Sequence, residues 1–141
     1  MSGERDAMQR AASGGRWMRR AVLATAAALL AAACGDEAER MRRGAALTGG
    51  DPHRGREQIR QYGCNTCHTV PGVRGADALV GPPLAGVGGR MYIAGVLSNT
   101  PANMILWLKD PPSVDSLTAM PNTGVTDRDA RDIAAYLYSL D

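Results

Sequence analysis

The chain has 141 residues and a formal net charge of +2, enough for one small domain with a leader. It holds 17 glycines and 8 prolines and lacks phenylalanine, so large apolar side chains are scarce. Residues 1–33 carry five arginines against two acidic residues, a net of +3, which leaves −1 for the remainder. This balance argues against a nucleic-acid-binding surface on the rest of the chain.

An apolar run follows two arginines near the start of the chain. Arg19 and Arg20 precede this run over residues 21–33, which ends at Cys34. A basic segment, a short apolar stretch and small residues before a cleavage point are typical of an export signal. The run is shorter than the roughly 20 residues of a membrane-spanning helix. We therefore predict that residues 1–34 are a signal region, with Met18 as an alternative start.

Cys34 has no second cysteine at a spacing that suggests a partner. Residues 30–35, LAAACG, are similar to a bacterial lipoprotein signal, in which the cysteine is lipidated and becomes the new N-terminus. The alternatives are ordinary cleavage near Ala33 and an uncleaved helical anchor. We interpret Cys34 as the lipidated residue, because an unpaired thiol in an exported protein needs a role.

The remaining chain divides into a linker and one helical domain. Residues 35–50 are rich in charge, glycine and alanine without strong periodicity, which predicts a flexible linker. Residues 51–141 are predicted to be an all-α domain, since no window alternates apolar and polar residues. Proline and threonine signals and apolar spacing predict helices over about 51–62, 100–109 and 126–140.

The strongest chemical signal is the pentapeptide CNTCH at residues 64–68, which is typical of covalent haem attachment. Each of the thiols of Cys64 and Cys67 can add to a haem vinyl group, and His68 can ligate the iron. A structural zinc site needs four ligands, and a thioredoxin-like motif needs a βαβ context. The chain offers neither pattern around this motif, so we predict one covalently bound haem c.

Several segments in the same order resemble the class I cytochrome c family over residues 51–141. They are Gly55 with Gly63–His68, the loop 81–90 (GPPLAGVGGR), Ala119–Asn122 and the C-terminal stretch 132–137. The resemblance implies a cytochrome c fold, with three main helices around one haem. The run 99–111 is similar to small bacterial cytochromes associated with, or fused to, haem–copper oxidases.

This resemblance also implies roles for residues around the haem. The backbone carbonyl of Pro82 would accept a hydrogen bond from His68, although the two prolines 82 and 83 can equally serve to stiffen the loop. Arg90 would pair with one haem propionate, or else be a surface charge. Trp107 would donate its indole N–H to the other propionate, or else be a core aromatic residue.

The sixth iron ligand is sought among the methionines that follow the motif, Met91, Met104 and Met120. Met104 lies within a predicted helix and is expected to pack in the core. Met120 lies in an irregular segment before a proline, and both this placement and the family resemblance favour it as the ligand. His53 is a competing ligand, but it precedes the first helix and is expected to be exposed.

A haem with histidine and methionine ligands has both axial positions filled, which favours electron transfer. We predict a carrier of single electrons on the periplasmic side of the cell membrane, either lipid-anchored or soluble. A quinol-oxidising complex would be its donor and a terminal oxidase its acceptor. The alternatives are a haem enzyme or gas sensor with a labile sixth ligand, and a fixed subunit of a larger complex.

Overall fold

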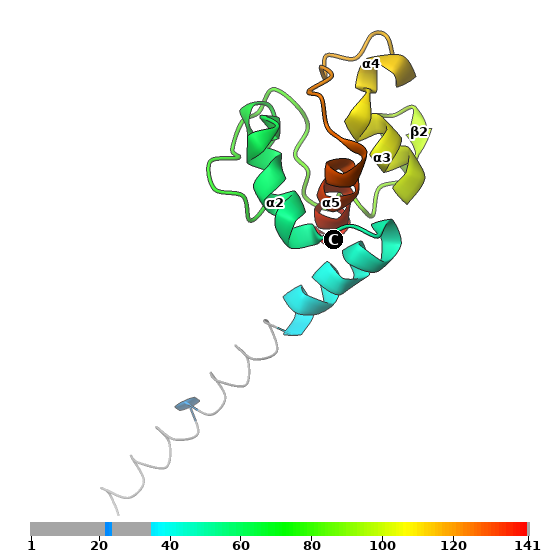
Figure 1. Ribbon diagram of the computed structural model, residues 1–141. Helices are drawn as coiled ribbons and strands as arrows, with labels where there is room; N and C mark the ends of the chain where they lie inside the picture. Colours follow the sequence, from blue (N-terminus) through cyan, green and yellow to red (C-terminus); the bar gives the residue numbers. More distant parts are fainter. Residues whose placement is uncertain (1–21, 24–34, 141) are drawn as a thin grey trace, which may run out of the picture. The chain divides into compact units, whose positions relative to one another are not determined.

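The computed structural model describes residues 22–23 and 35–140, and the chain divides into two compact units, 1–36 and 37–141. The second unit is mainly helical, as predicted (Figure 1). Its named elements are α2 (Pro52–Gln61), the 3₁₀ helix η1 (Cys64–Thr66), β1 (Tyr92–Ile93), β2 (Leu97–Ser98), α3 (Pro101–Lys109), α4 (Pro111–Val114) and α5 (Asp127–Leu137). Among the described residues, no helix combines the length and the apolar character needed to cross a membrane.

The predicted helix starts are confirmed by their caps. The Asp51 carboxylate accepts hydrogen bonds from two amides of the first turn of α2, and Pro52 follows it. Thr100 caps α3, and Thr126 caps α5 by accepting from the Asp129 amide. Each cap satisfies amides that have no partner within the helix. The sequence therefore determines these helix starts locally.

Helices α2 and α5 cross in close contact at Gly55. A Cβ atom at this position would lie 1.9 Å from the carbonyl oxygen of Asp132 in α5. Real side chains do not tolerate such a distance, so only glycine allows the two backbones to approach this closely. Tyr136 of α5 donates its hydroxyl proton to the carbonyl of Pro71.

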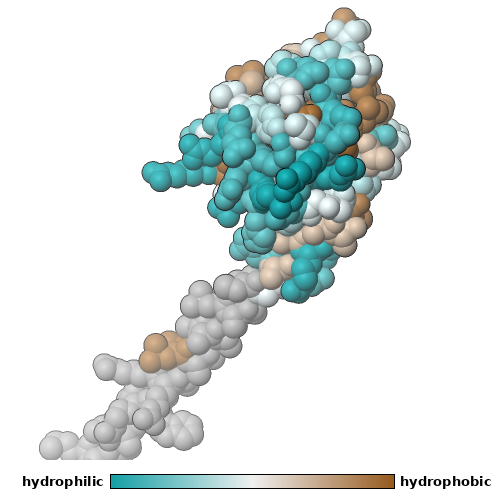
Figure 2. Space-filling model, viewed as in Figure 1, coloured by the Kyte–Doolittle hydropathy of each residue, from teal (hydrophilic) through white to brown (hydrophobic). Residues whose placement is uncertain are grey.

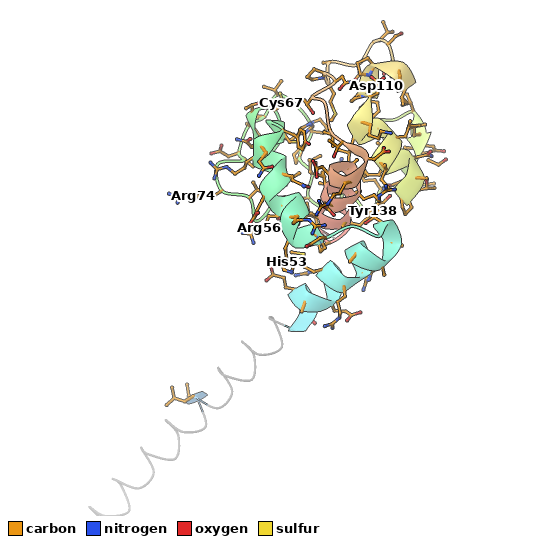
Figure 3. The ribbon with its side chains drawn as sticks, viewed as in Figure 1. His53, Arg56, Cys67, Arg74, Asp110 and Tyr138 are labelled. Carbon is orange, nitrogen blue, oxygen red and sulfur yellow. The ribbon has the colours of Figure 1, made fainter. Side chains whose placement is uncertain are left out.

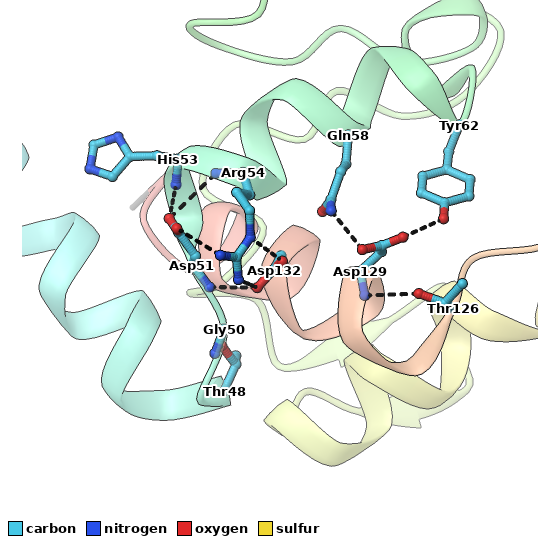
Figure 4. Close-up of polar contacts among 10 residues, drawn as sticks. All are labelled: Thr48, Gly50, Asp51, His53, Arg54, Gln58, Tyr62, Thr126, Asp129 and Asp132. Atoms are coloured by element: carbon cyan, nitrogen blue, oxygen red, sulfur yellow. Dashed lines mark hydrogen bonds and ion pairs between the residues drawn. The ribbon is translucent and has the colours of Figure 1, made fainter.

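A polar network joins the same two helices (Figure 4). Asp132 is 1% exposed, and its carboxylate accepts from Arg54 Nε at 2.9 Å, from Arg54 Nη2 at 3.1 Å and from the Asp51 amide at 2.6 Å. Burial by itself would raise the pKa of Asp132. The hydrogen bonds from Arg54 and Asp51 outweigh this effect, so that pKa lies below its usual value.

The second acidic group of this network is Asp129. Its carboxylate accepts from Gln58 Nε2 at 2.7 Å and from the Tyr62 hydroxyl at 2.6 Å (Figure 4). The hydrogen bond to Asp129 raises the pKa of Tyr62. The side chain of Asp129 thus reaches from the first turn of α5 to Gln58 of α2 and to Tyr62, the residue that ends α2.

The prediction of a flexible linker over residues 35–50 is wrong for most of that segment. Residues 35–48 are helical, and Met41, Gly44 and Thr48 are buried along one side of the helix. A Cβ at Gly44 would lie 2.0 Å from the carbonyl oxygen of Ala135, so this helix packs directly on α5. Its apolar face is made mostly of small residues, which give only a weak periodic signal.

The core of the second unit lies around α5, which contacts both α2 and α3. Residues 133–135 have no exposed surface, and Ile59 of α2 and Met104 of α3 pack into the same cluster. A small antiparallel pair, β1 and β2, precedes α3. Hydrophilic side chains cover much of the face seen in Figure 2. The segments 63–91 and 115–125 lie between the main helices, and they contain most of the candidate site residues.

Candidate functional site

The motif CNTCH forms one tight turn directly after α2. Gly63 adopts a left-handed conformation with φ +73°, which ends α2 and directs the chain into η1. The amides of Cys67 and His68 both donate to the carbonyl of Cys64, at 3.2 and 3.0 Å. Cys64 and Cys67 are free thiols, and Figure 3 labels Cys67 at the end of this turn. The backbone thus holds two thiols and one imidazole within five residues.

The Cys64 thiol is partly withdrawn from water. Burial raises the pKa of this thiol, because the thiolate is poorly solvated inside the protein. Cys64 also packs against the hydrophobic core. In these partly apolar surroundings, the Cys64 thiol can form a thioether with an apolar group that packs beside it.

His68 is oriented by the carbonyl of Pro82, as the family resemblance implied. Its Nδ1 atom lies 2.8 Å from Pro82 O. A carbonyl oxygen can only accept, so Nδ1 carries a proton in this bond, and in the neutral imidazole the lone pair is then on Nε2. This is the tautomer that a metal-binding histidine requires.

The loop that carries Pro82 is fixed to the motif by backbone bonds. The Gly81 amide donates to Cys67 O at 2.7 Å, and the Leu84 amide donates to Thr69 O at 2.8 Å. A Cβ at Gly81 would lie 2.5 Å from His68 Cε1, so the loop passes close to the edge of the imidazole ring. A larger residue at position 81 would displace the ring or the loop.

Arg90 takes a position that sequence reasoning did not foresee. Its Nη2 atom donates to the carbonyls of Pro83 and Ala85, which follow Pro82 in the same loop. The expected pairing of Arg90 with a haem propionate stays a prediction. In the structure this arginine binds the loop that orients His68.

The three candidate methionines lie in different surroundings. Met104 is 2% exposed and belongs to the core, as expected, whereas Met91 is 79% exposed. Met120 is partly buried and packs against the core from the irregular segment before α5. This placement leaves Met120 as the methionine that is neither committed to the core nor turned to solvent.

The remaining candidate residues are Trp107, His53 and Cys34. Trp107 is 7% exposed and belongs to the core, which agrees with its interpretation as a core aromatic residue; its bond to a propionate stays a prediction. His53 is exposed at the start of α2, as expected (Figure 3). Cys34 lies outside the described residues.

These residues fit a covalently attached haem. Two free thiols stand at the spacing that thioether formation needs, and the neighbouring imidazole is held through Nδ1, which leaves Nε2 as the nitrogen for a metal. Cysteine thioethers, histidine and methionine are the donor set of c-type haem sites.

Comparisons with known proteins agree with this chemistry. The family model described as "Cytochrome c" matches residues 52–141. The chain is 34% identical over 89 residues to cytochrome c oxidase subunit 2 of Alkalihalophilus pseudofirmus, covering 62% of this chain and 25% of that protein. It is 35% identical over 86 residues to the same subunit of Bacillus subtilis, covering 60% of this chain and 24% of that protein.

The matched part of the chain thus spans about a quarter of the length of these curated relatives. No solved structure matches the chain.

Proposed function

The chain belongs to the cytochrome c family, and on this premise we propose that it carries single electrons through one covalently bound haem c. The observation that supports this most directly is the hydrogen bond from His68 Nδ1 to Pro82 O, next to two free thiols. When bound, the haem supplies an iron that changes by one electron between the ferric and ferrous states.

The residues around the haem would divide the work of binding it. Cys64 and Cys67 hold the porphyrin covalently, and His68 provides the fifth ligand through Nε2. The carbonyl of Pro82 keeps the imidazole in one orientation and raises its basicity. Met120 provides the sixth ligand, and its thioether stabilises the reduced state.

This ligand set suits electron transfer better than catalysis. With both axial positions filled by protein, small molecules have no open coordination position. The two ligands are retained in both oxidation states, so little rearrangement accompanies each transfer. As the family resemblance implies, Trp107 and Arg90 would be donors to the haem propionates.

The partners we propose are a quinol-oxidising complex as donor and a terminal oxidase as acceptor. Support comes from the names of the relatives, which are subunits of cytochrome c oxidases. The domain would work on the periplasmic side of the membrane, anchored through lipidated Cys34. The export signal over residues 1–34 supports that location.

The first experiment tests haem attachment. The protein is produced in a host with a cytochrome c maturation system, then extracted with acidified acetone and weighed by mass spectrometry. We expect the haem to stay with the protein and the mass to rise by one haem. A Cys64→Ala/Cys67→Ala variant is the control and should lose the haem on extraction. A parent protein that matures without haem would overturn the proposal.

The second experiment separates an electron carrier from a gas sensor or haem enzyme. Carbon monoxide is added to the reduced protein and the absorption spectrum is recorded. A carrier with Met120 bound to iron should show an unchanged spectrum at neutral pH. A spectrum that changes at once on addition would favour a labile sixth ligand.

A further inference from the structure

Asn99 lies between β2 and α3, partly buried, and its side-chain amide binds a whole loop. Its Nδ2 atom donates to the carbonyls of Val87 at 2.8 Å, Gly88 at 3.1 Å and Arg90 at 2.8 Å. Its backbone amide also donates to Met91 O at 3.0 Å. The loop 87–91 therefore wraps around this one residue.

The orientation of the Asn99 amide group is fixed from the other side. Its Oδ1 atom accepts from the Tyr138 hydroxyl at 2.7 Å, so the nitrogen must face the loop. Tyr138 is the C-cap of α5. The Gly86 amide donates to Leu140 O at 2.9 Å nearby, so the loop is held to the end of the last helix at two points.

Hydrogen bonds and the backbone between them connect Asn99 to His68. Asn99 binds the Arg90 carbonyl, and the Arg90 guanidinium binds the carbonyls of Pro83 and Ala85. The residue just before Pro83 is Pro82, whose carbonyl accepts from His68 Nδ1. Because each contact is next to the following one, a displacement of the loop 87–91 at Asn99 should move the Pro82 carbonyl, which is the acceptor of His68.

We propose that Asn99 is a positioning residue for the axial histidine. It keeps the loop 87–91 in place, and through Arg90 it holds the Pro82 carbonyl on the imidazole. Outer partners of a metal-binding histidine set its orientation and basicity. The inference rests on the proposed function, because it gives His68 the role of iron ligand.

The test measures the hydrogen bond of His68 in the holoprotein. In the reduced state the haem is diamagnetic, so proton NMR can follow exchange of the His68 Nδ1 proton with water. Asn99→Leu removes both donor and acceptor at similar size, and Asn99→Asp replaces the donating nitrogen with an oxygen. Both should speed exchange of the Nδ1 proton at least tenfold relative to the Ile133 amide in α5, which reports global opening.

The matched control is Asn103→Leu. Asn103 lies four residues after Asn99, and its side chain donates to the Ser98 carbonyl, a bond that does not involve the loop 87–91. This variant should leave the ratio of the two exchange rates at the parent value. Equal acceleration of the Nδ1 proton and the Ile133 amide in the Asn99 variants would mean loss of global stability alone, and would overturn the proposal.

Arg90→Leu decides the question if the Asn99 variants do not fold. It breaks the path one step closer to His68 and should also speed exchange of the Nδ1 proton selectively. An unchanged ratio in Arg90→Leu would overturn the proposal. A parent protein without bound haem would instead contradict the proposed function, and the absorption spectrum shows this before any exchange is measured.

Discussion

Met120 is the methionine whose surroundings suit an axial ligand. It combines partial burial with an irregular backbone, whereas Met104 is enclosed within α3 and Met91 is turned to solvent. A thioether on a flexible side chain can approach the iron from such a segment. The proposed sixth ligand is a single side chain, so one substitution can test it.

Met120→Ala should abolish the weak near-infrared absorption of the oxidised protein that arises from sulfur-to-iron charge transfer. It should also lower the reduction potential and open the iron to carbon monoxide, because the thioether favours ferrous iron. Absorption spectroscopy and a redox titration measure these changes.

Met104→Leu is the matched control, since a buried methionine tolerates an apolar residue of similar volume at a cost below about 1.5 kcal/mol. It should keep the near-infrared band. Survival of the band in Met120→Ala would exclude Met120, and Met91 would become the next candidate despite its exposure.

Asp132 links the stability of the domain to pH. Its pKa is lower in the folded than in the unfolded chain, because Arg54 and the Asp51 amide stabilise the carboxylate despite its burial. Its contribution is therefore fully present above the unfolded pKa of about 3.9 and is lost as pH falls through the folded value.

Asp132→Asn should lower the free energy of unfolding at pH 7 by about 2 kcal/mol, the scale of hydrogen bonds to a charged group. The loss should begin to shrink below about pH 4, where the unfolded chain takes up the proton, and should vanish as pH falls through the lower pKa of the folded carboxylate. Urea titrations of the holoprotein at several pH values measure both effects. Asp127→Asn, which removes an exposed partner of Lys109, should cost clearly less than Asp132→Asn, because solvent screens an exposed ion pair. Equal costs for the two variants would contradict a special role for the buried carboxylate.

At the scale of elements, the helix over residues 35–48 extends the fold beyond the part that matches the family model. Its contact with α5 depends on Gly44, where the two backbones leave no room for a side chain. Thr48 supports the end of this helix by accepting from the Gly50 amide and donating to Gly44 O.

Gly44→Ala should lower the melting temperature of the holoprotein. The added methyl group would overlap the Ala135 carbonyl, and overpacking of this kind costs about 2 kcal/mol. Gly35→Ala is the control on the same helix, since a Cβ there meets nothing within 4 Å. It should keep the parent stability or gain up to about 1 kcal/mol from helix propensity. A stable Gly44→Ala protein would show that the helix does not pack on α5.

Local signals explain why the three main helices were predictable. Thr100, Thr126 and Asp51 are caps whose effect depends on the next three residues alone. The helix over 35–48 was missed because its buried face, Met41 with Gly44 and Thr48, offers little apolar area. Its stability comes from a fit to α5 that no local pattern reveals.

The candidate site, like the helices, could be predicted only in part. The spacing of CNTCH marks the thiols and the histidine in any context, and the family resemblance pointed correctly to the Pro82 carbonyl. The bonds of Arg90 and Asn99 could not be foreseen, because they go to backbone carbonyls. A carbonyl is present at every residue, so only the folded loop decides which ones meet a donor.

At the scale of the whole molecule, the proposed membrane anchor is a lipid on Cys34. Lipidation would place the attachment point one residue before the helix over residues 35–48. Cys34→Ser should therefore move the protein from the membrane to the soluble fraction after cell breakage and centrifugation. Mass spectrometry of the parent should find a lipid on an N-terminal cysteine.

Two other results would contradict lipidation. Continued membrane retention of Cys34→Ser would point to an uncleaved helical anchor, and a mature N-terminus elsewhere would point to ordinary cleavage. Cys34→Ala should behave like Cys34→Ser, because neither side chain can form the thioether bond to a lipid. Haem content should be unchanged in both variants.

The crossing of α2 and α5 also has a consequence for the order of events during synthesis. The helices that meet at Gly55 come from opposite ends of the domain, and the first residue of α5, Asp127, lies 59 positions after His68. A chain that crosses the membrane from its N-terminus therefore delivers the attachment motif well before α5. Contacts between distant segments form late. In a chain that is exported and loaded with haem as we propose, the thiols would stay accessible while the chain is open, and the arrival of α5 would close the fold over a bond already made.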